Sequence, residues 1–193
     1  MSSNLVAIGA SWGGLDALRT ILHGLPPSLD AAVVVAQHRS PESHRTAFRD
    51  LLGAATSLRV CEAGDKDELR PGTVYLAPPD YHLLVDQGGL SLSTDAPVFY
   101  ARPSIDVLLE SAAESYRERC IGLILTGANA DGARGLARVV ALGGTAIVQD
   151  PAEAIREEMP RAALAAVPSA RVGKMGEIAS LLVELCGSAK VSA

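Results

Sequence analysis

The 193-residue sequence has few aromatic residues, few cysteines and no long apolar run. Aromatic side chains make up 4% of the chain, whereas glycine (18 residues) and alanine are abundant, which suits close packing of helices on a sheet. Cys61, Cys120 and Cys186 are widely spaced and odd in number. They therefore predict buried reduced thiols and argue against a disulfide framework or a metal site. No apolar run approaches the roughly 20 residues that a membrane-spanning helix needs.

The charge and the start of the chain exclude further classes of protein. The net charge is −5 and there is no basic run, so neither nucleic acid nor an anionic membrane is an expected partner. Residues 1–4 lack the charged segment and the apolar segment of a signal peptide. We therefore expect a cytoplasmic protein with no membrane insertion. Its 48% hydrophobic and 20% charged residues indicate one globular domain.

Strand patterns alternate with helical patterns through most of the chain. The strand patterns cover residues 5–8, 31–36, 58–62, 73–77, 120–126 and 145–149. The helical patterns cover residues 15–25, 42–52, 133–142, 159–167 and 176–186, and another helix opens over 104–109. We predict an α/β fold, a doubly wound and mainly parallel sheet flanked by helices, with an antiparallel hairpin over 82–92 that turns at 87–89. The domain is expected over residues 1–186, and a frayed tail over 187–193.

A glycine-rich turn after the first strand holds one serine. It places the Ser11 hydroxyl at the carboxyl end of a strand and the amino end of a helix, close to free backbone N–H groups. The run Gly9-Ala10-Ser11-Trp12-Gly13 also fits the G-x-S-x-G pattern of a nucleophile elbow. The turn therefore makes Ser11 a candidate nucleophile.

Reacting groups gather beyond the carboxyl ends of the strands in sheets of this kind. His38 follows the second strand, and Asn129 and Asp131 follow the strand that ends at Thr126. Singly, such residues are more often an N-cap serine, a structural histidine and an Asp-Gly turn. Together a hydroxyl, an imidazole and a carboxylate are the groups needed for acyl transfer, in which the histidine is the base and the aspartate orients it.

Other histidines compete with His38 for the role of base. His23 and His44 lie within predicted helices, while His82 lies near the active edge of the sheet and is the one rival. No histidine follows Asp131, so the usual α/β-hydrolase order of serine, acid and late histidine is excluded.

The same turn has a second possible use, as a dinucleotide-binding loop. It approximates G-x-G-x-x-G, but serine replaces the middle glycine, and the second strand ends without an acidic residue. Arg39 could serve a 2′-phosphate there, so NAD(P) binding ranks second. The chain has no Walker A sequence and no paired Cys/His metal spacing. We therefore predict no cofactor and no metal.

The chain resembles the catalytic domain of CheB-type chemotaxis-receptor methylesterases over nearly its whole length. The matching segments are residues 8–11, 13–14, 37–38, 71–78, 102–106, 125–127, 131–133, 135–136 and 159–160. The resemblance implies that Ser11 is the nucleophile, His38 the base and Asp131 the orienting acid of a catalytic triad. This assignment agrees with the trio found from the strand ends.

The resemblance also implies an activity, hydrolysis of glutamate γ-methyl esters to glutamate and methanol, with deamidation of certain glutamines. The implied partner is the cytoplasmic domain of a methyl-accepting chemoreceptor or a related methylated signalling protein. Backbone N–H groups around Trp12 and Gly13 are candidate oxyanion donors. Ala128 and Asn129 are further candidates for the oxyanion site or the pocket wall. No cofactor is implied.

Three departures from the family pattern limit what the resemblance implies, and two of them support a second hypothesis. Trp12 stands where the family usually has threonine, and Gly127-Ala128-Asn129 stands where it has Gly-Met-Gly. The first strand starts at Leu5, so we expect no receiver domain in this chain, and receiver control absent or supplied in trans. The second hypothesis is a binding or scaffold module of a signalling complex that keeps the fold but has lost turnover because of Trp12 and Ala128.

Overall fold

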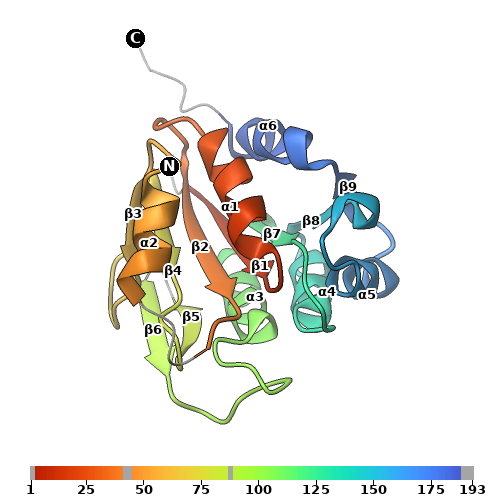
Figure 1. Cartoon of the computed structure of the whole chain (residues 1–193), viewed down its shortest axis with the longest axis horizontal. Coiled ribbons are helices and arrows are strands. Elements are labelled where there is room, and N and C mark those ends of the chain that lie inside the picture. The colour runs from red at the N-terminus through yellow and green to blue at the C-terminus, as the bar shows by residue number, and fades with distance from the viewer. Residues whose placement is uncertain (1–2, 41–44, 87–88, 188–193) are drawn as a thin grey trace.

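The computed structural model describes residues 3–40, 45–86 and 89–187, and its strands form two sheets (Figure 1). All pairings in the larger sheet are parallel. Its strand order is β3 (Arg59–Glu62), β4 (Thr73–Leu76), β2 (Ala31–Gln37), β1 (Asn4–Ala10), β7 (Cys120–Ile124), β8 (Thr145–Gln149) and β9 (Arg171–Gly173). The predicted doubly wound, mainly parallel α/β fold is confirmed.

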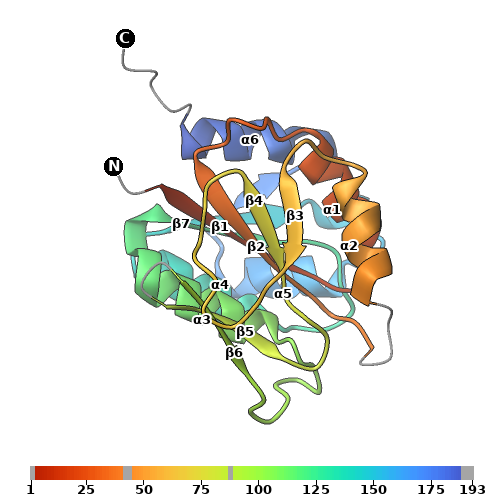
Figure 2. The same ribbon diagram turned by 90° about the vertical axis from the view of Figure 1, so that its left-hand side faces the viewer.

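Helices cover both faces of this sheet (Figure 2). They are α1 (Gly14–His23), α2 (Arg45–Gly53), α3 (Ile105–Tyr116), α4 (Ala133–Ala141), α5 (Glu158–Ala166) and α6 (Met175–Cys186). One apolar cluster joins the sheet to α1, α6 and Leu52 of α2, and the other joins it to α3, α4 and α5. The central strands are therefore buried on both faces, which explains their continuous apolar runs. Among the described residues, no helix combines the length and the apolar character needed to cross a membrane.

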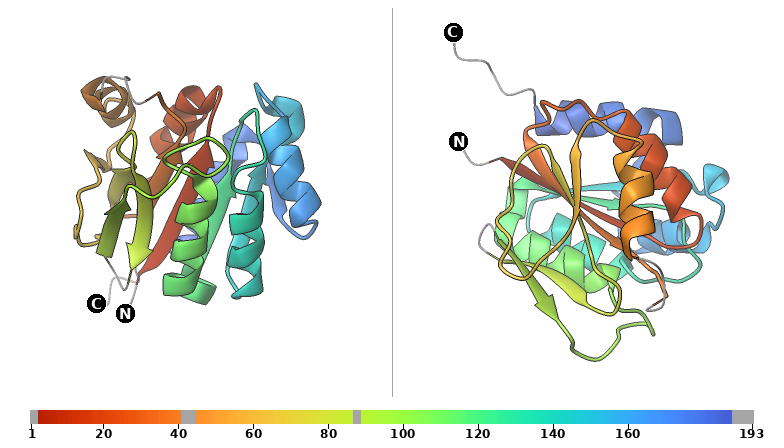
Figure 3. Two further views of the ribbon diagram at one scale, coloured as in Figure 1. Left: turned by 90° about the horizontal axis from the view of Figure 1, so that it is seen from below. Right: turned by 60° about the vertical axis from the view of Figure 1, so that its left-hand side comes forward.

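The predicted hairpin is β5 (His82–Asp86) paired antiparallel with β6 (Gly89–Ser93). Its apolar side chains join the α3 side of the core, and Figure 3 shows it beside that helix. Residues 87–88 of the predicted turn lie outside the described residues. So do residues 42–44 of the second predicted helix and residues 188–193 of the predicted tail.

Some boundaries differ from the sequence prediction for identifiable reasons. The strand predicted over 120–126 ends at Ile124, and the Thr126 N–H donates to the Gln149 side chain at 2.8 Å instead of to a neighbouring strand. The edge strand β9 was not predicted, because it has three residues and two of them are exposed. Two 3₁₀ turns, η1 (Arg117–Arg119) and η2 (Pro151–Glu153), were not predicted either.

The sheet order brings three chain-distant segments to one edge. Strand β1 lies between β2 and β7, with Ala10 opposite Gln37 and Gly9 opposite Ile124. All three strands run in the same direction, so the residues that follow them meet at the carboxyl edge. Helix α3 begins at this edge too. A Cβ on Gly9 would lie 2.1 Å from the Ile105 side chain, so only glycine allows the start of α3 to pack so closely on β1.

Candidate active site

Ser11 lies in the tight turn between β1 and α1. Its N–H donates to the Thr126 carbonyl at 2.9 Å, and its carbonyl accepts from the Gly14 N–H at 2.8 Å. Gly13 is the N-cap of α1 with φ of 81°, a left-handed conformation that favours glycine. Among the described residues, the N–H groups of Trp12 and Gly13 have no acceptor. They are thus two unpaired donors beside the Ser11 hydroxyl.

Gln37, the last residue of β2, ties this turn to the neighbouring strand. Its buried side-chain amide donates to the Ser11 carbonyl at 2.8 Å and to the His38 carbonyl at 3.1 Å. The His38 N–H donates to the Ala10 carbonyl at 3.0 Å. The two segments that carry Ser11 and His38 are therefore held together. The positioning role of Gln37 was missed in the sequence, where a polar residue ending an otherwise apolar strand was the available signal.

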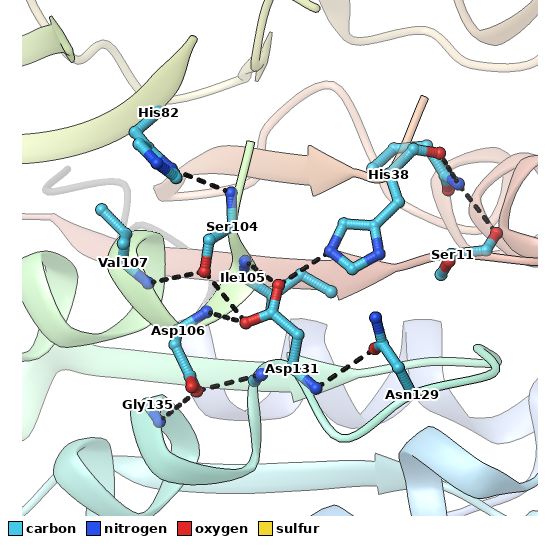
Figure 4. A network of polar contacts seen from close by, with 12 residues as sticks. Ser11, His38, His82, Ser104, Ile105, Asp106, Val107, Asn129, Asp131 and Gly135 are labelled. Carbon is cyan, nitrogen blue, oxygen red and sulfur yellow. Dashed lines mark hydrogen bonds and ion pairs between the residues drawn. The ribbon is translucent and has the colours of Figure 1, made fainter. Parts of the chain in front are cut away.

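His38 contacts Asp131 directly, with 2.8 Å between Nε2 and Oδ2. The Asp131 carboxylate can only accept, so we assign the imidazole proton to Nε2. The other ring nitrogen, Nδ1, then carries a lone pair, and it faces Ser11 (Figure 4). Among the described residues, the Ser11 hydroxyl makes no hydrogen bond. Such a contact is often completed only when substrate is bound.

The amino end of α3 surrounds the fully buried Asp131 carboxylate (Figure 4). Its Oδ1 accepts from the Ser104 hydroxyl and the Asp106 N–H, both at 2.9 Å. Its Oδ2 accepts from the Ile105 N–H at 2.7 Å. Burial by itself raises the pKa of Asp131, but the hydrogen bonds from His38, Asp106 and Ile105 outweigh it and lower the pKa below its ordinary value. The acid is thus ionised and oriented.

Asp106 makes the reciprocal contact with the amino end of α4. Its Oδ1 accepts from the Gly132 N–H at 2.9 Å and the Gly135 N–H at 2.7 Å. Burial raises the pKa of Asp106, and the nearby Asp131 charge adds to that effect. Two buried acids with opposite pKa shifts therefore lie side by side, and only Asp131 reaches the histidine.

His82 is not placed to act as the base. It is 1% exposed, its Nδ1 accepts from the Ser104 N–H at 3.1 Å, and its Nε2 lies 3.1 Å from the Ala96 carbonyl. Both ring nitrogens are therefore engaged in structural contacts. Its position near the edge was predicted correctly, but the structure removes it as a rival to His38.

A cavity of about 410 Å³ opens beside His38. Asn129 lines it together with the turn at Phe99 and Tyr100, and the Asn129 Oδ1 accepts from the Asp131 N–H at 3.1 Å. Trp12 does not line this cavity. Its ring is 66% exposed and lies 5.8 Å from the Arg156 guanidinium. Ala128 is exposed as well, so neither Trp12 nor Ala128 lines the space beside His38, whereas Asn129 of the second departure does.

The alternative dinucleotide site loses its candidate phosphate ligand. The Arg39 side chain donates to the Ala77 carbonyl at 2.9 Å, pairs with Glu62 at 3.7 Å and lies 4.5 Å from the centre of the Phe48 ring. These contacts engage the guanidinium within the protein, although the residue also lines the cavity beside His38. Within the described part of the chain, no group of three His, Cys, Asp or Glu residues could hold a metal ion.

Known proteins resemble this chain over almost its full length. The sequence model of the CheB methylesterase family matches residues 6–182. A protein of Leptospira interrogans, provisionally named protein-glutamate methylesterase/protein-glutamine glutaminase, is 42% identical over 186 residues, 96% of this chain and 96% of that protein. Protein-glutamate methylesterase FrzG of Myxococcus xanthus is 42% identical over 176 residues, which are 88% of this chain and 52% of FrzG. This chain thus spans about half the length of FrzG.

A solved structure agrees with these relatives. The crystal structure of the Thermotoga maritima CheB methylesterase catalytic domain matches with a TM-score of 0.90 and 34% identity, covering 96% of this chain and 100% of that one. Since the family model, the relatives and the fold all coincide, this chain belongs to the CheB methylesterase family.

Proposed function

We propose that this protein hydrolyses glutamate γ-methyl esters on the cytoplasmic domain of a methyl-accepting chemoreceptor or a related methylated signalling protein. The observation that carries the proposal is the 2.8 Å contact between His38 and Asp131 at the strand edge that also bears Ser11. Membership of the CheB methylesterase family and relatives named protein-glutamate methylesterase/protein-glutamine glutaminase support the same reaction. The proposal places the protein in the cytoplasm with its substrate.

In the proposed mechanism Ser11 Oγ attacks the ester carbonyl carbon while His38 Nδ1 takes the serine proton. The same proton then passes to the leaving methoxide, so methanol departs and a glutamyl ester of Ser11 remains. Water then attacks this ester while His38 Nδ1 takes its proton, and the same proton returns to Ser11 Oγ as the glutamate carboxylate is released. With a glutamine substrate, ammonia replaces methanol.

The unpaired N–H groups of Trp12 and Gly13 are the proposed oxyanion donors. A single donor of this kind is typically worth about 10²–10³ in rate. The proposed Trp12 contribution comes from its backbone N–H and does not depend on its exposed side chain. Asn129 is proposed as a pocket residue, since it lines the same cavity as His38. Ala128 is exposed and is not among the residues that line this cavity.

Methanol release from a methylated receptor cytoplasmic fragment tests the proposal. We expect Ser11→Ala to lower kcat by at least about 10³-fold, with binding of the fragment retained. A serine-directed fluorophosphonate should label the wild-type chain at Ser11 stoichiometrically. A folded wild-type chain that binds the fragment but releases no methanol and takes up no label would instead support the scaffold hypothesis.

Control by a receiver domain supplied in trans stays a prediction. Its test is the rate of methanol release with and without a phosphorylated receiver domain added as a separate chain. An unchanged rate at saturating receiver would contradict it.

A further inference from the structure

Ser104 and His82 take no part in the proposed reaction, yet both are buried and connected to its acid. Ser104 is the N-cap of α3 and is fully buried, and His82 is 1% exposed. Hydrogen bonds join them in sequence, from the Ala96 carbonyl through His82 and Ser104 to Asp131 (Figure 4 shows the last three residues). The chain of contacts ends at the carboxylate that orients His38.

The direction of each proton in this chain is determined by its neighbours. The Ser104 N–H donates to His82 Nδ1, so that nitrogen is unprotonated and the ring proton lies on Nε2, directed to the Ala96 carbonyl. The Ser104 oxygen accepts from the Val107 N–H at 3.4 Å. Its single proton is thereby directed to Asp131 Oδ1, at 2.9 Å.

Among the described residues, Ser104 supplies the one hydrogen bond to Asp131 Oδ1 that comes from a side chain. The other donor to this oxygen is the Asp106 N–H, and Oδ2 is held by the Ile105 N–H and by His38 itself. Backbone donors are present whatever the side chains are. Apart from His38, the Ser104 hydroxyl is therefore the side-chain contact that sets the position and the proton affinity of Asp131.

We propose that Ser104, held by His82, is a positioning residue that keeps Asp131 ionised with Oδ2 turned toward His38. The inference rests on the proposed function and assigns to His82 the task of orienting the start of α3. Three other titratable or charged groups set the background around Asp131: His38 at the end of β2, Asp106 in α3 and Arg134 in α4. In the described structure, the Ser104 hydroxyl bonds to Asp131 and Val107 and to none of these three groups.

The first test compares Ser104→Ala with Ser104→Thr. Removal of the hydroxyl should lower kcat about tenfold, the scale of one hydrogen bond to a charged group, with KM nearly unchanged. The Asp131 carboxyl then takes up a proton at a higher pH than in the wild type. The acid limb of the kcat/KM profile should therefore shift to higher pH. Ser104→Thr keeps a hydroxyl at an N-cap that accepts threonine, and it should restore both kcat and the profile.

The second test uses a matched pair at His82. In His82→Asn the side-chain oxygen takes the place of Nδ1 and still accepts from the Ser104 N–H. In His82→Gln the amide nitrogen takes the place of Nε2 and still donates to the Ala96 carbonyl. We expect the Gln variant to lose more kcat than the Asn variant, because only the latter keeps Ser104 in place.

The outcomes separate this inference from the proposed function. If the wild type releases no methanol, the rate of Ser11 modification by a fluorophosphonate replaces kcat in every comparison. A folded Ser104→Ala variant with wild-type kcat and a wild-type pH profile would overturn the inference. If Ser104→Ala does not fold, the His82 pair decides, and equal losses in both variants would overturn it.

Discussion

Asp131 is a fully buried carboxylate stabilised by four hydrogen bonds, three of them from the N-cap and the first two residues of α3. The partial positive charge of a helix amino end favours an anion at this place. Because the resulting pKa is lowered, Asp131 stabilises the folded state above the ordinary aspartate value, and this stabilisation is lost as pH falls through the folded pKa. The same charge fixes the tautomer of His38.

Replacement of Asp131 by asparagine should lower kcat by about 10³–10⁴-fold. The amide can donate to His38 Nε2, which moves the imidazole proton to Nδ1 and removes the lone pair that faces Ser11. KM for a methylated receptor fragment should change little, because residue 131 is buried and has no access to substrate. Initial rates of methanol release give both constants, and circular dichroism controls for folding. A kcat within tenfold of wild type would contradict the assigned tautomer.

At the scale of elements, α3 and α4 begin side by side, and an aspartate next to each helix accepts hydrogen bonds from the amino end of the other. Asp131 lies just before α4 and binds the amino end of α3, while Asp106 lies in the first turn of α3 and binds the amino end of α4. The close approach depends on Gly135, where a Cβ would lie 2.6 Å from the Leu109 Cβ. Each helix thus caps the other, and one cap doubles as the catalytic acid in the proposed mechanism.

Asp106 should stabilise the fold because its side-chain oxygen accepts hydrogen bonds, and its negative charge should not add to that stability. The pKa of Asp106 is raised above the ordinary value of 3.8. The contribution of this carboxyl to the free energy of unfolding is therefore fully present below pH 3.8 and is lost as pH rises through the folded pKa. Asp106→Asn keeps an acceptor and cannot ionise. Its stability relative to wild type should therefore increase as pH rises.

Asp106→Ala is the matched loss of the acceptor and should cost about 1–3 kcal/mol of unfolding free energy. Urea unfolding at pH values from about 4 to 8 measures both variants against the wild type, the range being chosen around the ordinary carboxyl values. An Asn variant that loses relative stability with rising pH would show that the charge itself stabilises the fold.

The turn at Phe99 and Tyr100 is a second element with an uncommon composition. Both residues have positive φ, at 49° and 59°, between the bridged residues Val98 and Ala101. The base of the loop is held by Arg102, whose guanidinium donates to backbone carbonyls of the loop and to Asp80. Glycine or asparagine would fit such a turn with less strain.

We expect the double variant Phe99→Asn, Tyr100→Gly to be about 1–2 kcal/mol more stable than wild type, because the strain of positive φ is relieved. Both aromatic side chains are more than half exposed and line the cavity beside His38. Their loss should lower kcat/KM for the receptor fragment several-fold relative to kcat/KM for a small ester.

A matched control for this variant is Val172→Ala, an exposed apolar residue on the edge strand β9. It should leave the ratio of the two kcat/KM values unchanged. Equal effects of the double variant on the receptor fragment and on the small ester would contradict a substrate contact at the turn.

At the scale of the whole molecule, the proposed active site lies far from the first residue of β1 and the last residue of α6. The proposed site occupies the carboxyl edge of the sheet, while the start of β1 and the end of α6 meet at the opposite edge, where the Asn4 side chain donates to the Cys186 carbonyl at 3.1 Å.

A folded domain fused before Asn4 or after Cys186 should therefore leave kcat/KM for a small ester within about twofold of the unfused chain, because neither attachment point faces the catalytic edge. Steady-state assays of both fusions check this. A large loss in either fusion would mean that the ends influence the carboxyl edge through the sheet.

The alternation of strand and helix patterns was sufficient to predict the parallel sheet, since apolar periodicity is a local property of the chain. It also placed Ser11, His38 and Asp131 at one edge, because the carboxyl ends of parallel strands must coincide. The three-residue strand β9 escaped prediction because exposed residues carry no such periodicity.

What the sequence by itself determined is which chemical groups reach the edge of the sheet. Only the tertiary structure decided which histidine pairs with Asp131 and what holds that acid in place. His82, Ser104 and Asp106 lie 49, 27 and 25 positions from Asp131 along the chain. Contacts between such distant residues arise from the packing of α3 against β1 and α4, and side-chain packing of this kind leaves no periodic signal in the sequence.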